Sequence, residues 1–129
     1  SSIFLKISDI LSEENNPTVK VEASINEVII EISNKRLGAT AVIDNDELKG
    51  IITDGDLRRM LENGASFTDL KANDIMNEYP KTILNNTLVY DALQLMEASN
   101  ISQLVVMDSY SSKYVGIVHL HDILKEGVV

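Results

Sequence analysis

Cysteine, long apolar runs and basic segments are all missing from this sequence of 129 residues. The absence of cysteine excludes disulfide frameworks and thiolate metal sites, and it is typical of a reducing compartment. Without a run of about 18 uncharged apolar residues we expect no membrane-spanning helix. Residues 1–6 also lack the charged region and apolar core of a signal peptide. The sequence therefore predicts a cytoplasmic protein without a membrane partner.

A basic face is missing as well, because the net charge is −9 and acidic residues are spread over both halves of the chain. Binding to nucleic-acid phosphates needs clustered Lys and Arg, so nucleic acid is not an expected partner. A small anionic ligand is compatible with this charge if a few basic groups and helix N-termini hold it locally.

The usual catalytic patterns are absent too: there is no nucleophile–base pair, no glycine-rich phosphate loop and no obvious pair of carboxylates. We therefore predict that this chain has no catalytic residues and requires no cofactor. Its length and its 44% of hydrophobic residues suffice for one compact domain or two very small ones.

The sequence does contain an internal repeat of roughly 65 residues. Residues 50–57 return as residues 116–123, and both copies run from a glycine through an apolar strand to an aspartate, Asp56 or Asp122. Further matches pair the following segments: 6–11 with 71–76, 17–19 with 80–82, and 37–44 with 101–108. We divide the chain into repeats 1–66 and 67–129. Neither has enough core to stand alone, so we expect them to pack together and frame a cleft.

Periodicity predicts the same order of elements in each repeat. In the first, Ser24 and Glu27 form a capping box, and the helix behind it carries an apolar stripe of Ile25, Val28, Ile29 and Ile32. Strands over 39–43 and 48–53 follow, joined by a turn. A second helix is expected over about 54–63, burying Leu57, Met60 and Leu61 and stopped by Gly64.

The second repeat shows a short helix at 74–76, a strand near Thr82 and a helix that we expect Thr87 to cap. The apolar stripe predicted for that helix is Leu88, Ala92, Leu95 and Met96. Strands over 103–107 and 114–119 and a last helix to about 125 complete the repeat. Each unit is thus strand–helix–strand–strand–helix, which places the chain in the α/β class.

This order, with a Gly-h-h-Thr-x-x-Asp segment at 50–56, resembles the tandem CBS domain pair. The second copy departs from the motif, since His119 stands where threonine is expected. Segments 53–59, 119–124 and 127–129 together resemble one subfamily, the C-terminal CBS pair of the arabinose-5-phosphate isomerases.

The resemblance implies a regulatory region whose catalytic sugar isomerase (SIS) domain lies upstream and is absent from this chain. The parent protein would convert ribulose 5-phosphate to arabinose 5-phosphate for Kdo biosynthesis, serving lipopolysaccharide or capsule.

Two interpretations of Thr53, Asp56 and Asp122 compete. Threonine and aspartate three residues apart before a helix form a capping box that needs no ligand. In CBS pairs similar to this one, however, the aspartate accepts hydrogen bonds from ribose hydroxyls and the threonine reaches ribose or phosphate. Because His119 is a poor cap, the retained Asp122 favours a role in ligand binding beyond capping.

His119 and His121 are candidates for contact with an anionic ligand, and a metal site is the alternative that their spacing allows. No third convergent ligand is visible, so we predict no metal. Arg58 and Arg59 point about 100° apart on a helix, so at most one can face the cleft, and we choose Arg58. Four further ligand-binding candidates lie on or beside the strands: Lys20, Thr82, Ala39 and Ser102.

By resemblance to the subfamily, the expected ligand is CMP-Kdo or another cytidine nucleotide, with AMP or ATP as the general CBS alternative. We also expect a homodimer formed through the CBS pairs. The competing hypotheses are an assembly module that binds no ligand and an autonomous enzyme.

Overall fold

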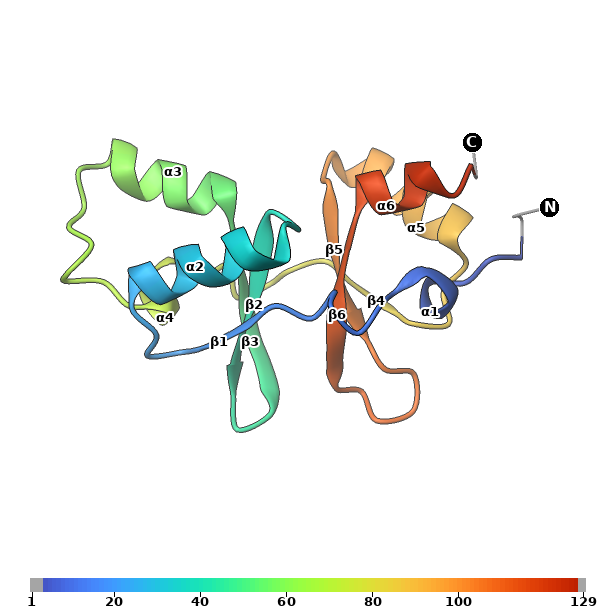
Figure 1. The fold of residues 1–129 in the computed structure, drawn as a ribbon, viewed down its shortest axis with the longest axis horizontal. Helices are drawn as coiled ribbons and strands as arrows, with labels where there is room; N and C mark the ends of the chain where they lie inside the picture. Colours follow the sequence, from blue (N-terminus) through green and yellow to red (C-terminus); the bar gives the residue numbers. More distant parts are fainter. Residues whose placement is uncertain (1–3, 128–129) are drawn as a thin grey trace.

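Two three-stranded sheets stand side by side and their helices lie on the outside, as Figure 1 shows. This is a computed structural model that describes residues 4–127. The first sheet, in the order β1-β2-β3, contains Thr18–Lys20, Ala39–Asp44 and Glu47–Thr53. The second, β4-β5-β6, contains Thr82–Leu84, Gln103–Met107 and Tyr114–His119. Val128 and Val129, which contribute to the subfamily resemblance, lie outside the described residues.

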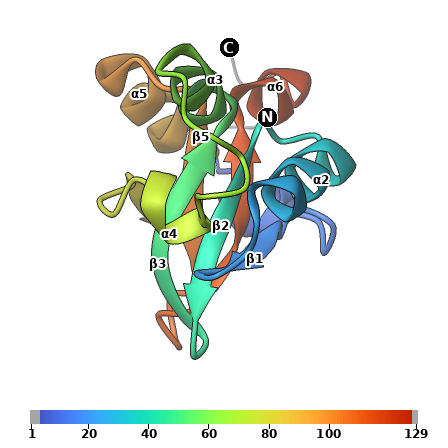
Figure 2. The same cartoon turned by 90° about the vertical axis from the view of Figure 1, so that its left-hand side faces the viewer.

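The helices confirm the predicted α/β class and the strand–helix–strand–strand–helix order in both repeats. They are α1 (Ile7–Ile10), α2 (Ile25–Lys35), α3 (Asp54–Glu62), α4 (Ala72–Ile75), α5 (Val89–Ser99) and α6 (Leu120–Lys125). Figure 2 shows α2, α3 and α4 arranged around the first sheet. Among residues 4–127, no helix combines the length and the apolar content needed to cross a bilayer.

The N-terminus of α2 is the capping box expected from the sequence. The Ser24 hydroxyl accepts from the backbone N–H of Glu27 at 3.2 Å, and the Glu27 carboxylate accepts from the N–H of Ser24 at 3.4 Å. Ile25, Val28 and Ile32 are buried, so the predicted stripe faces the sheet.

Three predictions for the other helices are wrong. The N-cap of α5 is Leu88, whose side chain makes no capping bond; Thr87 lies one residue earlier, in a turn that its N–H closes on the Leu84 carbonyl at 3.0 Å. With that start, the buried stripe is Val89, Ala92, Leu93 and Met96. In α3, Leu61 is 53% exposed because the last turn of the helix packs through Met60.

The registers of the two sheets correct one detail of the repeat. Thr18 pairs with Ala41 in the first sheet, and Thr82 pairs with Val105 in the second. Thr18 is therefore the counterpart of Thr82. The sequence match of Pro17 with Pro80 is wrong by one residue, since Pro17 occupies the place of Lys81.

The leading segment of each repeat packs on the other repeat. Ile7 of α1 is buried with Val89 and Leu93 in the core of the second sheet. Ala72 of α4 is buried with Val42 in the core of the first. Figure 1 shows the result: α1 lies on the side of the second sheet and α4 on the side of the first. Each hydrophobic core is thus completed by residues from both halves of the chain.

Two glycines let these crossing segments approach the hairpins. The Ile51 N–H donates to the Asn77 carbonyl at 3.0 Å, and the Asn77 N–H returns a bond to Ile51 at 2.8 Å. In the second sheet the Ile117 N–H donates to the Asn15 carbonyl at 2.7 Å. A Cβ built on Gly50 or Gly116 would lie 2.6 Å from the crossing carbonyl oxygen. The repeated glycine is therefore required by this close backbone contact.

We expect Gly50→Ala and Gly116→Ala to lower the free energy of unfolding by about 1–3 kcal/mol each, because the added methyl group meets backbone that cannot move aside cheaply. Urea unfolding of the 129-residue chain measures this effect. Gly55→Ala is the matched control, since its Cβ would come no closer than 3.4 Å to a flexible arginine side chain. That variant should stay within about 1 kcal/mol of wild type. Equal effects at all three glycines would contradict this explanation.

Candidate functional site

The predicted site residues at the ends of β3 and β6 gather at one end of the seam between the sheets. Thr53, the last residue of β3, pairs with Ala39, and His119, the last residue of β6, pairs with Gln103. The Gln103 side-chain amide donates across the seam to the Leu37 carbonyl at 3.3 Å. Figure 1 shows α3 and α6 starting at this same end of the molecule.

Thr53 and Asp56 form a complete capping box at the start of α3. The Thr53 N–H donates to Asp56 Oδ2 at 2.8 Å, and the Asp56 N–H donates to Thr53 Oγ1 at 3.2 Å. The other carboxylate oxygen, Oδ1, accepts from Arg59 at 2.5 Å. The Arg59 side chain is 66% exposed and that of Asp56 is 18% exposed. An ion pair to so exposed an arginine contributes little to stability.

The second copy of the motif is also a capping box, which corrects the expectation for His119. The His119 N–H donates to Asp122 Oδ2 at 3.0 Å, and His119 Nδ1 accepts from the His121 N–H at 3.0 Å. An imidazole nitrogen thus replaces the threonine hydroxyl, reaching the second N–H of the helix. The inference that His119 is a poor cap, and that Asp122 therefore does not depend on a capping partner, is wrong, because His119 is that partner.

The two imidazole rings of this box stack, with centroids 4.7 Å apart and planes inclined by 10°. Because His119 Nδ1 accepts a hydrogen bond, the proton of the neutral ring is on Nε2. Burial lowers the pKa of His119, the neighbouring His121 lowers it further, and the Asp122 carboxylate opposes both. Within residues 4–127 no group of three or more His, Cys, Asp or Glu side chains is placed to hold a metal ion.

The remaining predicted residues are distributed around the seam and away from it. The Ser102 carbonyl accepts from the Leu120 N–H at 2.8 Å, which places Ser102 beside the second capping box. Arg58 is exposed on α3, and Thr82 is exposed in β4. Lys20 pairs with Ile43, near the opposite end of β2 from Ala39.

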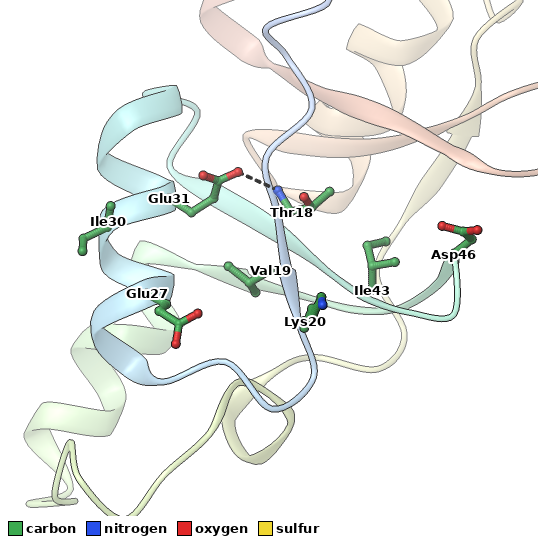
Figure 3. A pocket seen from close by; sticks show the side chains of 8 residues that line it. All are labelled: Thr18, Val19, Lys20, Glu27, Ile30, Glu31, Ile43 and Asp46. Atoms are coloured by element: carbon green, nitrogen blue, oxygen red, sulfur yellow. Dashed lines mark hydrogen bonds between the residues drawn. The ribbon is translucent and has the colours of Figure 1, made fainter.

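Lys20 lines a different hollow, of about 680 Å³, between β1 and α2. Figure 3 shows the acidic side chains that share this hollow: Glu27, Glu31 and Asp46. Three carboxylates around one lysine disfavour a phosphate there. The structure thus brings Ala39, Thr53, Ser102 and His119 to one end of the seam and places Lys20 elsewhere.

Sequence reasoning missed two residues near the seam, Tyr114 and Glu31. The Tyr114 hydroxyl donates to the Pro17 carbonyl at 2.8 Å, and the Glu31 carboxylate accepts from the Thr18 N–H at 2.8 Å. One signal for them does exist in the sequence. Both are polar where the other repeat has leucine, Leu48 and Leu95 respectively.

The chain is a duplicated α/β module of two strand–helix–strand–strand–helix units. Each unit has an aspartate in a helix capping box beside the seam. The sequence matches the CBS domain family over residues 7–63 and 72–128, and the chain belongs to this family. The match confirms the CBS resemblance inferred from the repeated glycine-to-aspartate segment.

Among curated relatives, the Arabinose 5-phosphate isomerase KdsD of Yersinia pestis is 40% identical over 129 residues. The alignment covers 98% of this chain and 39% of the relative, so this chain spans well under half of that protein. A CBS domain protein of Pyrobaculum aerophilum complexed with AMP has a TM-score of 0.82 and 24% identity, over 95% of this chain and 97% of the other. The CBS domain pair of protein MJ0100, in complex with 5'-methylthioadenosine and S-adenosyl-L-methionine, has a TM-score of 0.82 and 27% identity, over 95% and 98%.

The capping role of His119 makes stability depend on pH. Because its pKa in the folded chain lies below the ordinary 6.5, the unfolded chain takes up a proton first as the pH falls. The contribution of His119 to the free energy of unfolding is fully present above the unfolded-state pKa and is lost as the pH falls towards the folded-state pKa. We expect wild type to lose more stability than His119→Gln between about pH 7 and pH 5.

Urea unfolding at both pH values measures that difference. The control is His121→Gln, which leaves the His119 ring in place and should keep most of the pH dependence, since burial is the largest cause of the shift. Identical pH profiles for wild type and His119→Gln would show that His119 does not contribute.

Proposed function

We propose that this chain is the nucleotide-sensing regulatory region of a sugar-phosphate isomerase of the arabinose 5-phosphate isomerase type. The 40% identity to such an isomerase along almost the whole chain supports the choice of parent protein. In that parent an upstream SIS domain interconverts ribulose 5-phosphate and arabinose 5-phosphate in the cytoplasm for Kdo biosynthesis. Repeats 1–66 and 67–129 form the module that senses the ligand.

The observation that carries this proposal is that one oxygen of the Asp122 carboxylate accepts no hydrogen bond from residues 4–127. Its Oδ2 is used in the capping box, whereas no residue between 4 and 127 donates to its Oδ1. A half-buried carboxylate oxygen at the seam is a suitable acceptor for the hydroxyl of a ribose. Capping and ligand binding are therefore compatible in one side chain.

The first cleft also offers a carboxylate oxygen to a ribose, once the ligand has displaced an arginine. Asp56 Oδ1 is bound to Arg59, which a ribose hydroxyl displaces. The released Arg59, or its neighbour Arg58, then lies close enough to neutralise a phosphate. Thr53, Thr82 and the small residue Ala39 complete this set, and His119, His121 and Ser102 complete the other.

The ligand that we propose is CMP-Kdo or another cytidine nucleotide, with AMP or ATP as the alternative. The complex of the MJ0100 CBS domain pair with 5'-methylthioadenosine and S-adenosyl-L-methionine supports the broader class, a nucleoside-containing ligand. Occupancy regulates the isomerase only if the ligand binds one conformation of the whole protein better than another.

A pure assembly module is the second candidate, and exposed apolar side chains on the helices favour it. Ile30, Leu61, Tyr90 and Leu124 are each more than two-fifths exposed. Such side chains are suited to a homodimer formed through helix faces. We propose this dimer as part of the sensor, and as its whole function if no ligand binds.

A thermal-shift series with AMP, ATP, CMP and CMP-sugars tests the sensor. A ligand at 100 times its dissociation constant should stabilise the chain by ~2.7 kcal/mol. Asp122→Ala should reduce the shift that the ligand causes, because the ribose loses its acceptor. Comparing each variant with and without ligand removes the cost of the lost cap.

The matched control is Asp9→Ala. Asp9 is the acidic residue of another capping box, accepting from the Lys6 N–H at 2.8 Å, and it lies on α1 away from the clefts. Its ligand-induced shift should equal that of wild type. The absence of a shift with every nucleotide would overturn the sensor and leave the assembly module.

A further inference from the structure

A polar link of a tyrosine and a glutamate joins the repeats on one side of the seam. We define it as Tyr114 and Glu31 together with the backbone of Pro17 and Thr18. The Tyr114 hydroxyl donates to the Pro17 carbonyl at 2.8 Å, and the Thr18 N–H donates to Glu31 Oε2 at 2.8 Å. Figure 3 shows the Glu31 carboxylate reaching from α2 to the start of β1. Residues 17–18 are thus held from both repeats at once.

The chemistry of Tyr114 is suited to a permanent link. Burial raises the pKa of its phenol well above the ordinary value, and the negative charge of Glu31 raises it further. The hydroxyl therefore stays protonated and keeps donating. The Pro17 carbonyl that receives it also accepts from the Ala41 N–H at 3.2 Å, so the tyrosine bonds directly to the β1–β2 junction.

Among residues 4–127, the other side of the seam has no equivalent link. Leu48 pairs with Ile43 just as Tyr114 pairs with Met107, so Leu48 is the counterpart of Tyr114. Leu95 takes the place of Glu31, since both are the seventh residue of their helix. The corresponding carbonyl, that of Lys81, keeps its bond from the Val105 N–H at 3.2 Å, and Leu48 has no hydroxyl to donate to it.

The linked segment borders a hollow at the start of β6. Asn16, Thr18, Tyr114 and Val115 line this hollow of about 370 Å³, together with Ile43, Asp46 and Lys113 near the hairpin turns. From there the inner face of β6 leads through Ile117, buried between the sheets, to His119, because alternate residues share a face. The Ile117 N–H donates to the Asn15 carbonyl at 2.7 Å, so the linked segment also meets β6 two residues before His119. Residues 15–18 therefore lie against the strand that carries His119 to its capping box.

We propose that Tyr114 and Glu31 are positioning residues that preform the cleft of His119 and Asp122, so that a nucleotide occupies it before the cleft of Thr53 and Asp56. The preference for one cleft rests on the proposed function, whereas the positioning does not. A wall that is already fixed needs no ordering when a ligand binds, which raises affinity. The Asp122 oxygen without a donor adds to the same preference, since Asp56 must first release Arg59.

Amide hydrogen exchange tests the positioning without any ligand. In Tyr114→Phe we expect exchange at Ala41 and Ile117 to become about fivefold faster, the effect of one lost hydrogen bond. Their counterparts Val105 and Ile51, which make the same bonds on the other side, should not change. Equal acceleration at all four amides, or none at any, would overturn the positioning role.

Further variants separate positioning from general destabilisation. Tyr110→Phe is the control for the substitution, since the Tyr110 side chain is 97% exposed. Val106→Ala destabilises the hydrophobic core that β5 and β6 form with α5, and it should not selectively accelerate amide exchange at Ala41. Glu31→Gln keeps an oxygen for the Thr18 N–H and should behave as wild type. Glu31→Leu, the residue of the other repeat, should resemble Tyr114→Phe.

Titration with AMP and with CMP, followed by NMR, tests the order of filling. Amides of Leu120 and His121 report one cleft, and those of Gly55 and Asp56 report the other. Tyr114→Phe should raise the dissociation constant of the His119 cleft about fivefold and leave that of the Asp56 cleft unchanged. An equal change in both clefts, or earlier filling of the Asp56 cleft in wild type, overturns the preference.

Failure of wild type to bind either nucleotide would contradict the proposed function and, with it, the preference for one cleft. The exchange result would still decide the positioning role separately.

Discussion

The close contact of two backbones at Gly50 and Gly116 is the constraint on which the rest of this structure depends. At each glycine a segment from the other repeat bonds to the last hairpin, through Asn77 in one case and Asn15 in the other. Ile7 and Ala72, which belong to those segments, then complete the core of the opposite repeat. The two repeats therefore cannot separate without exposing both cores, and the seam between them has a fixed geometry.

Local chemistry made most of the elements predictable. The Ser24 capping box, the stripe of α2 and the hairpin strands each follow from neighbouring residues, and the structure confirms them. Neighbouring residues do not predict which of the two hydrophobic cores a leading segment joins. Ile7 and Ala72 begin similar short helices, and nothing in their local sequence says that they pack on the opposite sheet. Only the glycine shared by both hairpins hints at a crossing backbone.

The candidate site was predictable where it repeats and not where it differs. The strand and helix pattern placed Thr53, Asp56 and Asp122 at strand-to-helix junctions. Propensity alone ranks histidine as a poor cap, yet His119 caps α6 because its Nδ1 reaches the second N–H of the helix, that of His121. Tyr114 and Glu31 act through backbone groups far away in sequence, so only their mismatch with Leu48 and Leu95 reveals them.

These mismatches bear on function because they fall on one side of the seam. In the proposed sensor the polar link and the histidine box both belong to the half with Asp122, whereas Arg59 is bound to Asp56 in the other half. A duplicated sensor with two identical sites would fill both over the same range of ligand concentration. Different preorganisation of the two proposed sites would separate the concentrations at which they fill. Each leading segment is anchored in both repeats, so in the proposed mechanism a ligand that moves one leading segment changes the seam, which a neighbouring domain can then detect.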